Sequence, residues 1–517
     1  MKQFLIIGFL MVFILTANML FAEEQVRKAN PPSQAEQDAP AQPAPATPAP
    51  VFKADPSGAN TGGAADVVGA TAGAPTADDM KKLAANEPLA VKLADVIGHN
   101  RTALNVVWML VCAYLVFFMQ AGFAMVETGF TRAKNAGHTM AMNMMVFVFA
   151  VLGYWICGYA FQMGGKGFFL SGSSYDVSII TLFMSQVVYM NIAATIPTGA
   201  MAERWTFKSL VVYGFFISMF TYPLYANWVW GGGWLSQLGK NFGLGHGVLD
   251  FAGSSVVHMV GGVSALTGAI VLGPRMGKYR ANGTPVAIPG HHIPMAIIGC
   301  LILFFGWFGF NSGPALAAGN LRIGVIAVNT MLASAAASFS AMLYMWIKYG
   351  KPDLSMCANG LLAGLVAITA PCAFVSTVGA VIIGLVAGVL CCASVFFVER
   401  TLKVDDPVGA VSVHGTCGAW GLIGLGLFAD GTYGDGLNNV PGTVKGLFYG
   451  GASQFAAEVI GVVVNFVFVF IVMYAFFTLL NKIIPLRVSE ETEFEGLDQN
   501  EVAVTAYPDF SVTKARR

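Results

Sequence analysis

Two short stretches of the sequence repeat one pattern of an acidic residue, a glycine and a histidine. In both copies an Asp is followed three residues later by Gly and eight residues later by His, from Asp250 to His258 and from Asp406 to His414. A helix rises about 1.5 Å per residue, so eight residues span about 12 Å and carry the His from a membrane edge towards the midplane. Polar groups at that depth usually face a pathway. Each of the two histidines could instead be a buried structural residue, but the repetition favours two imidazoles that line one central site.

A further aromatic residue lies where it could hold a cation. Trp230 precedes the three glycines Gly231–Gly233 at the end of an apolar run. An indole face attracts a small cation by about 1–2 kcal/mol once the site is partly dry, although Trp is also common at membrane interfaces. Two carboxylates, Glu127 and Glu458, lie in or at the ends of other apolar runs. For both, we favour pairing with a neighbouring helix over an ion path.

The composition indicates the kind of element that must position these residues. Hydrophobic residues make up 56% of the chain and charged residues 11%, and the mean hydropathy is +0.65. These values identify an integral membrane protein, and the formal net charge of zero gives no indication of a nucleic-acid partner. All eight cysteines lie in apolar stretches and none has metal-ligand spacing. We therefore expect buried thiols and no metal site.

Eleven runs without Lys or Arg predict eleven transmembrane helices, and the fold class is therefore all-α. The runs are 103–126, 138–163, 177–202, 209–229, 251–274, 293–311, 323–347, 354–371, 376–398, 408–429 and 448–481. With the amino terminus outside, the inner connections carry thirteen Lys and Arg and the outer ones five, which fits the positive-inside rule. Two sets of five helices, the second inverted, would place His258 in helix five and His414 in helix ten. Such an inverted repeat with a central site is typical of transporters.

The two ends of the chain differ from this apolar body. Residues 1–22 predict a signal peptide, because Lys2 precedes an apolar run that ends before an acidic pair. Residues 23–98 are rich in Ala and Pro and predict a disordered extracytoplasmic tether. The membrane domain is expected at 99–482, followed by a cytoplasmic tail at 483–517. The protein is thus expected to be a multi-pass protein of the cell (inner) membrane, with its amino terminus outside and its carboxyl terminus in the cytoplasm.

Several motifs, in order along the chain, are similar to those of one known family. They are Gly122–Ala124, Arg132–Asn135, Gly199–Arg204, the Trp230–Gly233 run, Leu249–Gly253, Gly306–Asn311 and Val404–Gly415. Together they resemble the ammonium transporter (Amt) family over about residues 103–498. The resemblance implies an eleven-helix protomer in a homotrimer, one pore for ammonium or ammonia in each protomer, and a function that is neither enzymatic nor cofactor-dependent.

The resemblance also implies roles for individual residues. His258 and His414 match the twin histidines that line the pore and hydrogen-bond each other. Asp250 matches the carboxylate that shapes the outer mouth and assists deprotonation, and Asp406 is its equivalent in the second repeat. Trp230 matches the indole of an outer ammonium site. Phe310 matches one ring of the stacked gate below it.

Three positions depart from the family pattern. Counted from the flanking motifs, the second gate ring falls on Tyr189 and has gained a hydroxyl. An aromatic residue of the outer site falls on Ser185, and a serine that donates to the bound cation falls on Pro314. Because proline has neither a side-chain donor nor a side-chain acceptor, the sequence predicts an altered substrate-recruiting site at the mouth.

The expected mechanism begins with ammonium at the outer mouth, where it loses a proton. Neutral ammonia then passes the histidines, and a proton carried separately makes transport electrogenic. One alternative is an ammonium sensor with a transporter-like body, which the altered mouth favours and the short segment after residue 482 opposes. A second is an Rh-like neutral channel for ammonia or another gas. A third, an intramembrane hydrolase using Ser412 and His414, is disfavoured because residues two apart on a helix point about 200° apart.

The carboxyl-terminal tail carries one further expectation. Its first part, Ser489–Asp498, resembles the family's tail that packs beneath neighbouring protomers. The resemblance implies a regulatory role and a PII-type signalling protein as partner. The match fades after Asp498, so the prediction of packing has more support than the prediction of a partner.

Overall fold

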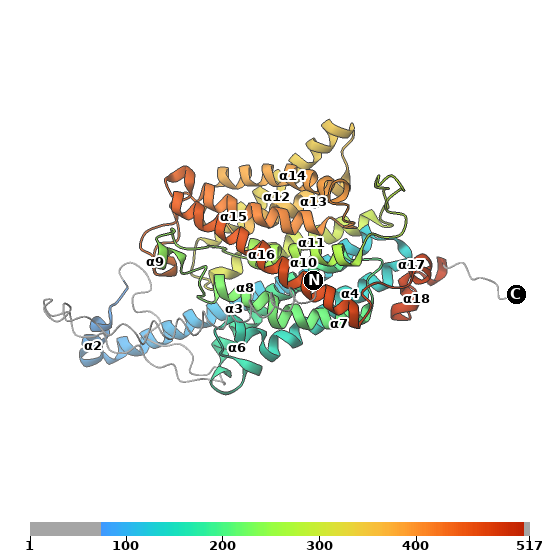
Figure 1. The fold of residues 1–517 in the computed structure, drawn as a ribbon. Helices are drawn as coiled ribbons and strands as arrows, with labels where there is room; N and C mark the ends of the chain where they lie inside the picture. The colour runs from blue at the N-terminus through green and yellow to red at the C-terminus, as the bar shows by residue number, and fades with distance from the viewer. Residues whose placement is uncertain (1–73, 511–517) are drawn as a thin grey trace. The chain divides into compact units, whose positions relative to one another are not determined.

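The computed structural model describes residues 74–510, and the regular secondary structure of these residues is helical (Figure 1). Within that part of the chain there is no β-strand, only isolated bridges. Between residues 74 and 510, ten helical segments are long and apolar enough to cross a membrane. They are Pro88–Phe130, Ala133–Gln162, Val177–Ala200, Phe207–Trp230, Ser254–Leu272, Ile293–Ala315, Ile323–Tyr349, Thr377–Arg400, Val411–Phe428 and Ala452–Ile483. The all-helical membrane class is thereby confirmed.

Several of these segments contain more than one regular element. The first half of the chain contains α2 (Ala77–Asn86), α3 (Pro88–Phe130), α4 (Ala136–Gly153), α5 (Tyr159–Gln162), α6 (Val177–Ala200), α7 (Phe207–Phe216), α8 (Tyr222–Trp230), α9 (Leu238–Phe242), the π-helical turn η8 (Ser254–Met259) and α10 (Val260–Leu272). The second half contains α11 (Ile293–Ser312), η9 (Gly313–Ala315), α12 (Ile323–Tyr349), α13 (Leu354–Thr369), α14 (Thr377–Arg400), the π-helical turn η10 (Val411–Thr416), α15 (Cys417–Phe428), α16 (Ala452–Ile483), α17 (Glu490–Glu495) and α18 (Leu497–Val502).

The predicted span 354–371 forms a helix of less than membrane length. It corresponds to α13, which has 16 residues and is therefore about 24 Å long at 1.5 Å per residue. A hydrocarbon core is about 30 Å thick, so α13 is short for a full crossing. Most of its apolar residues are nevertheless buried, and it packs against α12 and α14.

The amino-terminal boundary differs from the prediction. The tether was expected to extend through residue 98, but Ala77–Asn86 form α2, and α3 starts at Pro88. Thr76 and Asp79 form a reciprocal capping box at the start of α2, and proline at the first position of α3 has the φ angle that a helix requires. Local capping therefore overrides the tether-like composition. The predicted signal peptide and the tether before residue 74 lie outside the described residues.

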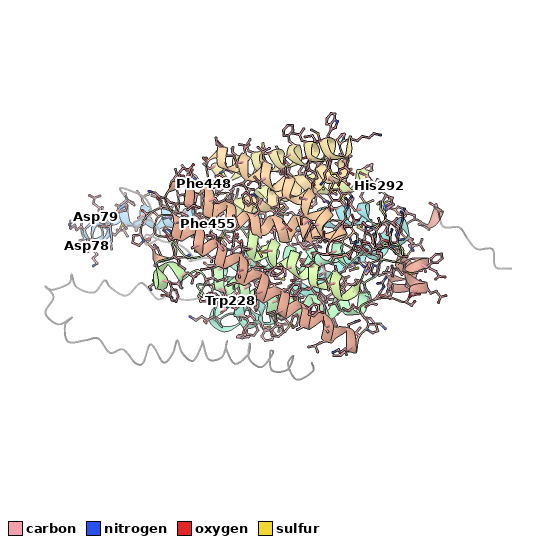
Figure 2. The ribbon with its side chains drawn as sticks, turned by 45° about the horizontal axis from the view of Figure 1, so that its top comes forward. Asp78, Asp79, Trp228, His292, Phe448 and Phe455 are labelled. Atoms are coloured by element: carbon pink, nitrogen blue, oxygen red, sulfur yellow. The ribbon has the colours of Figure 1, made fainter. Side chains whose placement is uncertain are left out.

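The helices define two ends of the described unit. The long helix α3 extends past its neighbours and carries α2 at its far end, whereas α17 and α18 lie at the opposite end (Figure 1). Asp78 and Asp79 of α2 and His292 are likewise seen at opposite ends (Figure 2). These are called the α2 end and the tail end below.

Small residues let the long helices approach closely. Along its length α3 packs against α11, while α10 packs against α6 and α16. A Cβ atom added to Gly299 of α11 would lie 2.7 Å from the Gly122 carbonyl oxygen of α3, which is too close for any side chain. Glycines at such crossings bring two backbones together, as is common between membrane helices.

At the tail end, a network of charges joins connections that are distant in sequence. Arg275 donates to Asp405 at 2.8 Å and to Glu203 at 2.8 Å, and Glu203 also pairs with Arg132. Burial alone would raise the pKa of Asp405, but the positive charge of Arg204 and the hydrogen bonds from Arg275 lower that pKa well below its ordinary value. These ion pairs join the segments that follow α3, α6, α10 and α14 at the tail end.

Candidate functional site

Each repeated Asp is a helix cap for the segment that carries the histidine. The Asp250 Oδ1 atom accepts from the backbone N–H groups of Gly253 and Ser254, both at 2.8 Å. Its Oδ2 atom accepts from the backbone N–H groups of Ser255 at 2.7 Å and Val256 at 2.8 Å, and from the Ser255 hydroxyl at 2.8 Å. Five hydrogen bonds thus hold the carboxylate at the start of η8.

The second copy has the same construction with fewer contacts. The Asp406 carboxylate accepts from the backbone N–H groups of Val408, Gly409 and Val411 at 3.3, 3.0 and 2.8 Å. In both copies the conserved spacing places a glycine at positive φ, 117° at Gly253 and 82° at Gly409. Side chains other than glycine rarely adopt that conformation. The repeat in the sequence is therefore a repeat of one local structure: a capping Asp, a glycine bend and a π-helical turn.

The two histidines meet in the interior. The Nδ1 atoms of His258 and His414 are 3.1 Å apart and the ring centroids are 5.2 Å apart. Both side chains are buried. A hydrogen bond between two Nδ1 atoms requires one ring to donate and the other to accept, so the rings must be different tautomers. One Nε2 therefore offers an N–H group and the other a lone pair.

A glycine crossing makes this approach sterically feasible. A Cβ atom added to Gly262 of α10 would lie 2.1 Å from the backbone nitrogen of Gly415 in η10. Any side chain there would separate the two segments and move the rings apart. The Gly262–Gly415 crossing therefore sets the distance between the histidines.

Aromatic rings cover the histidine pair on its α2 side. The His258 ring stacks on Trp307 and Phe310 with centroids 5.0 and 5.2 Å away. Phe310 in turn contacts Tyr189 at 4.7 Å, and the Tyr189 ring meets Trp230 edge to face at 5.9 Å. The sequence-predicted residues thus form one continuous column from Trp230 to His258.

Two hydrogen bonds fix the upper part of this column. The Trp230 indole donates from Nε1 to the Asp250 backbone oxygen at 2.6 Å, so the capped bend also holds the indole. The additional hydroxyl of Tyr189 donates to the Phe310 backbone oxygen at 2.7 Å. Asp250 therefore acts on both the histidine segment and the indole, through different atoms.

The other two departures lie close to Tyr189. Ser185 is buried one turn before Tyr189 on the same face of α6. Pro314 lies in η9, next to Gly313, where a Cβ atom would come within 2.9 Å of the Tyr189 hydroxyl. The altered positions therefore gather around one ring of the column.

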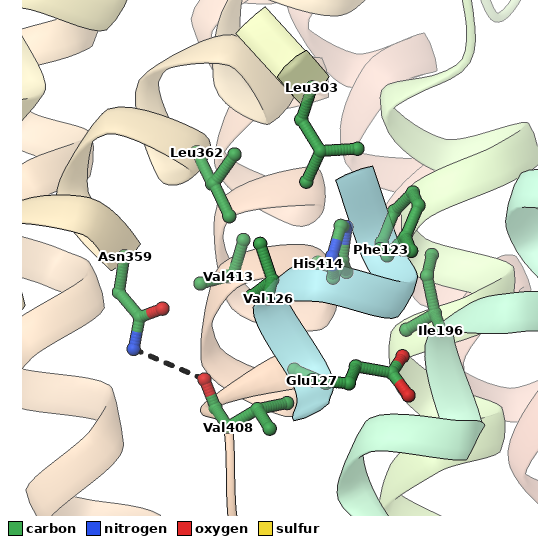
Figure 3. A pocket seen from close by; sticks show the side chains of 11 residues that line it. Phe123, Val126, Glu127, Ile196, Leu303, Asn359, Leu362, Val408, Val413 and His414 are labelled. Atoms are coloured by element: carbon green, nitrogen blue, oxygen red, sulfur yellow. Dashed lines mark hydrogen bonds between the residues drawn. The ribbon is translucent and has the colours of Figure 1, made fainter. Parts of the chain in front are cut away.

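A narrow cavity lies on the tail side of His414 (Figure 3). Apart from His414, its walls are mostly apolar, with Glu127 and Asn359 as the polar exceptions. The lining residues are Phe123, Val126, Glu127, Ile196, Leu303, Asn359, Leu362, Val408, Ala410, Val413 and His414. The histidine pair thus separates an aromatic column from an apolar cavity.

Sequence reasoning assigned no role to Trp307, Phe123 or this cavity. Trp307 could have been found because it lies three residues before Phe310 and therefore on the same face of α11. Phe123, whose ring centroid is 5.9 Å from His414, belongs to a quoted motif but had no role there. The cavity depends on side chains from several helices, and no local pattern indicates it.

The two intramembrane carboxylates are hydrogen-bonded to other helices or connections. Glu127 contacts Asn143 of α4 and Thr198 of α6. Glu458 instead accepts from the backbone of Leu249, in the connection before η8, at 3.0 Å and from Gln454 of its own helix at 2.7 Å, so these partners differ from the predicted neighbouring helix. Within residues 74–510, no group of three or more His, Cys, Asp or Glu side chains is arranged to hold a metal ion.

Comparison with known proteins places this geometry in context. The chain is 48% identical over 432 residues to ammonium transporter Amt2 of Archaeoglobus fulgidus, a match that covers 81% of this chain and 92% of the relative. It is 38% identical to ammonium transporter 1 member 3 of Solanum lycopersicum, with 77% and 91% covered.

Solved structures with the same fold include one described as a sensor protein and one described as Mep2. A structure described as a sensor Amt protein is 35% identical, with a TM-score of 0.70 and 78% of this chain and 99% of that chain covered. Mep2 of Candida albicans is 26% identical, with a TM-score of 0.67 and 75% and 87% covered. A model of the Ammonium Transporter Family matches residues 107–507. This chain belongs to the ammonium transporter family.

Proposed function

We propose that this protein transports ammonium across a membrane by passing neutral ammonia between His258 and His414 while the proton moves separately. The observation that carries the proposal is the buried histidine pair, joined through its Nδ1 atoms at 3.1 Å. A charged side chain at the centre of a bilayer costs about 2.5 kcal/mol or more, and neutral ammonia avoids a penalty of this kind. The pore therefore favours the deprotonated substrate.

Recruitment takes place at the α2 end of the aromatic column. Ammonium lies against Trp230 and the gate rings Tyr189 and Phe310, whose faces replace part of its hydration shell. Asp250 holds the indole and biases the local field towards cations, which keeps the ion at the mouth until it loses a proton. This proton loss lets the nitrogen enter the apolar part of the path.

Passage past the histidines uses their remaining ring nitrogens. The His258 Nε2 atom is buried and has no hydrogen-bond partner among the described residues. An Nε2–H group can donate to the ammonia lone pair, and an unprotonated Nε2 can accept an ammonia N–H. The same imidazoles carry the proton, which makes net transport electrogenic.

The same proposal covers the assembly and the orientation. The transporter is an eleven-helix protomer of a homotrimer, with α13 as the eleventh membrane helix and one pore in each protomer. The two histidine segments belong to a five-plus-five inverted repeat. The α2 end faces outwards and the tail end faces the cytoplasm of a cell (inner) membrane, in keeping with the excess of Lys and Arg in the tail-end connections.

A sudden rise in ammonium outside proteoliposomes that contain the purified protein tests the proposal. Transport predicts an inward current that saturates with ammonium concentration. Saturable binding without current would reject the proposal and would support an ammonium sensor. The likeness to a structure described as a sensor Amt protein favours that second function, as do the changes at Ser185 and Pro314.

The altered mouth predicts weak apparent affinity in a conducting protein. A hydrogen bond to a charged group contributes about 1.5–3 kcal/mol, so Pro314→Ser should lower the half-saturating ammonium concentration about tenfold or more. Ser185→Phe should lower it further through an added cation–π contact and slow the leakage of larger amines, without abolishing ammonium current. Current measured against ammonium and methylammonium concentration checks both changes.

Two matched variants separate these effects from loss of the original side chains. Pro314→Ala removes the ring without adding a hydroxyl, and Ser185→Leu adds apolar volume without an aromatic face. Equal tightening by Pro314→Ala and Pro314→Ser, or by Ser185→Leu and Ser185→Phe, would contradict the assigned chemistry.

The tail is proposed to regulate transport from the cytoplasmic side, with a PII-type protein as partner. Glu493 accepts from the Met276 backbone at 2.7 Å and pairs with Arg487, and Lys134 donates to the Glu493 backbone oxygen at 2.5 Å. Asp498 accepts from the His138 backbone at 2.9 Å. The tail is therefore hydrogen-bonded both to the α3–α4 region, at Lys134 and His138, and to the connection after α10, at Met276.

Truncation at Arg487 should reduce the ammonium current about fivefold or more, because a regulatory coupling is typically about 1–3 kcal/mol. Glu493→Gln should reproduce part of this loss, whereas Glu495→Gln should not, because Glu493 is buried and Glu495 in the same short helix is exposed. Current per reconstituted protein is the measurement. Unchanged transport after truncation would argue against the regulatory role.

A further inference from the structure

One buried carboxyl group lies at the tail-side cavity and has no part in the mechanism so far. Glu127 of α3 is 2% exposed and lines the same cavity as His414. In Figure 3 its side chain extends from α3 at the level of Val408, with His414 at another level of the cavity. Ammonia that passes the histidines into this cavity therefore comes beside Glu127.

The hydrogen bonds around Glu127 are best satisfied when its carboxyl group carries a proton. The Thr198 hydroxyl lies 2.6 Å from the Thr195 carbonyl oxygen and 2.9 and 2.8 Å from the two Glu127 oxygens. The Thr198 hydroxyl has one hydrogen, and a carbonyl oxygen can only accept. The hydroxyl therefore donates its hydrogen to the Thr195 carbonyl oxygen, which is its shortest contact. The contact between Thr198 and Glu127 then needs a hydrogen from the carboxyl group.

The electrical surroundings agree with a neutral carboxyl group. Within residues 74–510, no ion pair joins Glu127 to a cationic side chain. The titratable groups that face it are His414 across the cavity, Asp406 from the α14–η10 connection and Tyr213 from α7. A carboxylate buried without a cation is costly, so a cation that arrives beside Glu127 would stabilise the ionised form.

A neighbouring amide offers a further acceptor to such a cation. Asn143 donates from Nδ2 to Glu127 at 2.6 Å and to the Thr139 backbone oxygen at 3.1 Å. Its Oδ1 atom is buried and has no partner among the described residues. Beside the carboxyl group there is thus a free acceptor that could receive an N–H group.

We propose that Glu127 is a proton-exchange site that converts ammonia back to ammonium at the inner end of the pore. The Glu127 O–H bond breaks as its hydrogen forms a new N–H bond with the ammonia lone pair. The product is ammonium held by the Glu127 carboxylate and the Asn143 carbonyl oxygen. Ammonium leaves to inner water, and the proton that was removed at the outer mouth and carried along the histidines restores the carboxyl group. This step rests on the proposed electrogenic transport.

Glu127→Gln tests this role with little structural change. The glutamine carbonyl can accept from Asn143 and its amide can donate to Thr198, so it reproduces the hydrogen bonds of the neutral carboxyl group but cannot exchange a proton. Positioned acids and bases contribute about 100-fold or more, and some proton transfer through water remains, so the ammonium current should fall about tenfold or more. Ammonia movement, read as alkalinisation of the vesicle lumen, should continue.

Two further variants interpret that result. Glu458→Gln makes the same change at a buried carboxyl group that does not line the cavity and should keep its current. Glu127→Asp keeps an exchangeable proton, so its current should exceed that of Glu127→Gln at equal protein content. A Glu127→Gln current equal to that of the wild type, or equal losses in Glu127→Gln and Glu458→Gln, would overturn the proposal. Absence of current in the wild type would instead reject the proposed transport function.

Discussion

Replacing His258 or His414 by alanine is expected to abolish selective ammonium transport with a much smaller effect on protein yield. Each ring occupies the Nδ1 contact of the other at 3.1 Å. Removal of one ring leaves a buried nitrogen without its partner, at a cost of about 1–3 kcal/mol, and opens space that water and ions can fill. The fall in ammonium flux should therefore be accompanied by a new potassium current.

Currents from ammonium and potassium gradients in the same proteoliposomes check this expectation. His138→Ala is the matched control, because His138 is also fully buried but lies near the tail end against Phe207. It should retain the exclusion of potassium. Unaltered ammonium flux together with unaltered exclusion of potassium in both His258→Ala and His414→Ala would refute the pore assignment.

Replacing Asp250 by alanine is expected to lower folding yield and ammonium flux together. Four buried backbone N–H groups and one hydroxyl would lose their acceptor, and each unsatisfied group costs about 1–3 kcal/mol. The change also removes the charge beside the indole of Trp230. The amount of correctly assembled protein after size-exclusion chromatography and the flux per assembled protein are the two measurements.

Two comparisons separate the capping role of Asp250 from its charge. Asp406→Ala removes an acceptor from only three backbone N–H groups and should reduce yield less. Asp250→Asn keeps an oxygen acceptor but loses the charge, so it should recover part of the yield and less of the flux. Normal assembly and normal flux in Asp250→Ala would show that the cap is dispensable.

The parts of the site that were predictable are those set by local chemistry. The spacing of Asp250, Gly253 and His258 reports a cap, a bend and a buried turn, and all three belong to one continuous segment. The segment from Asp406 to His414 has the same spacing, so the sequence alone predicted that the two histidines occupy equivalent positions. The family resemblance implied a hydrogen bond between them, but its Nδ1–Nδ1 geometry depends on a backbone crossing at Gly262 and Gly415 that no local pattern specifies.

Other features were not predictable because they depend on residues distant in sequence or on competing local signals. Composition indicated a tether through residue 98, but the capping box at Thr76 and the proline at position 88 start helices earlier. Pairing of Glu127 with another helix was favoured correctly. The contacts that favour a protonated Glu127 could not be inferred, because they require the Thr195 carbonyl oxygen on α6 and the Glu127 carboxyl group on α3 to meet at the single Thr198 hydroxyl.

The central claim is that nitrogen crosses as neutral ammonia while its proton crosses separately. The most direct measurement records current and lumenal nitrogen together in proteoliposomes given equal inward gradients of ammonium and potassium. The account predicts a single positive charge for each nitrogen delivered and no potassium current. Nitrogen delivered without charge would indicate a neutral gas channel, and a potassium current comparable to the ammonium current would indicate passage of the intact cation. Either result would contradict the account.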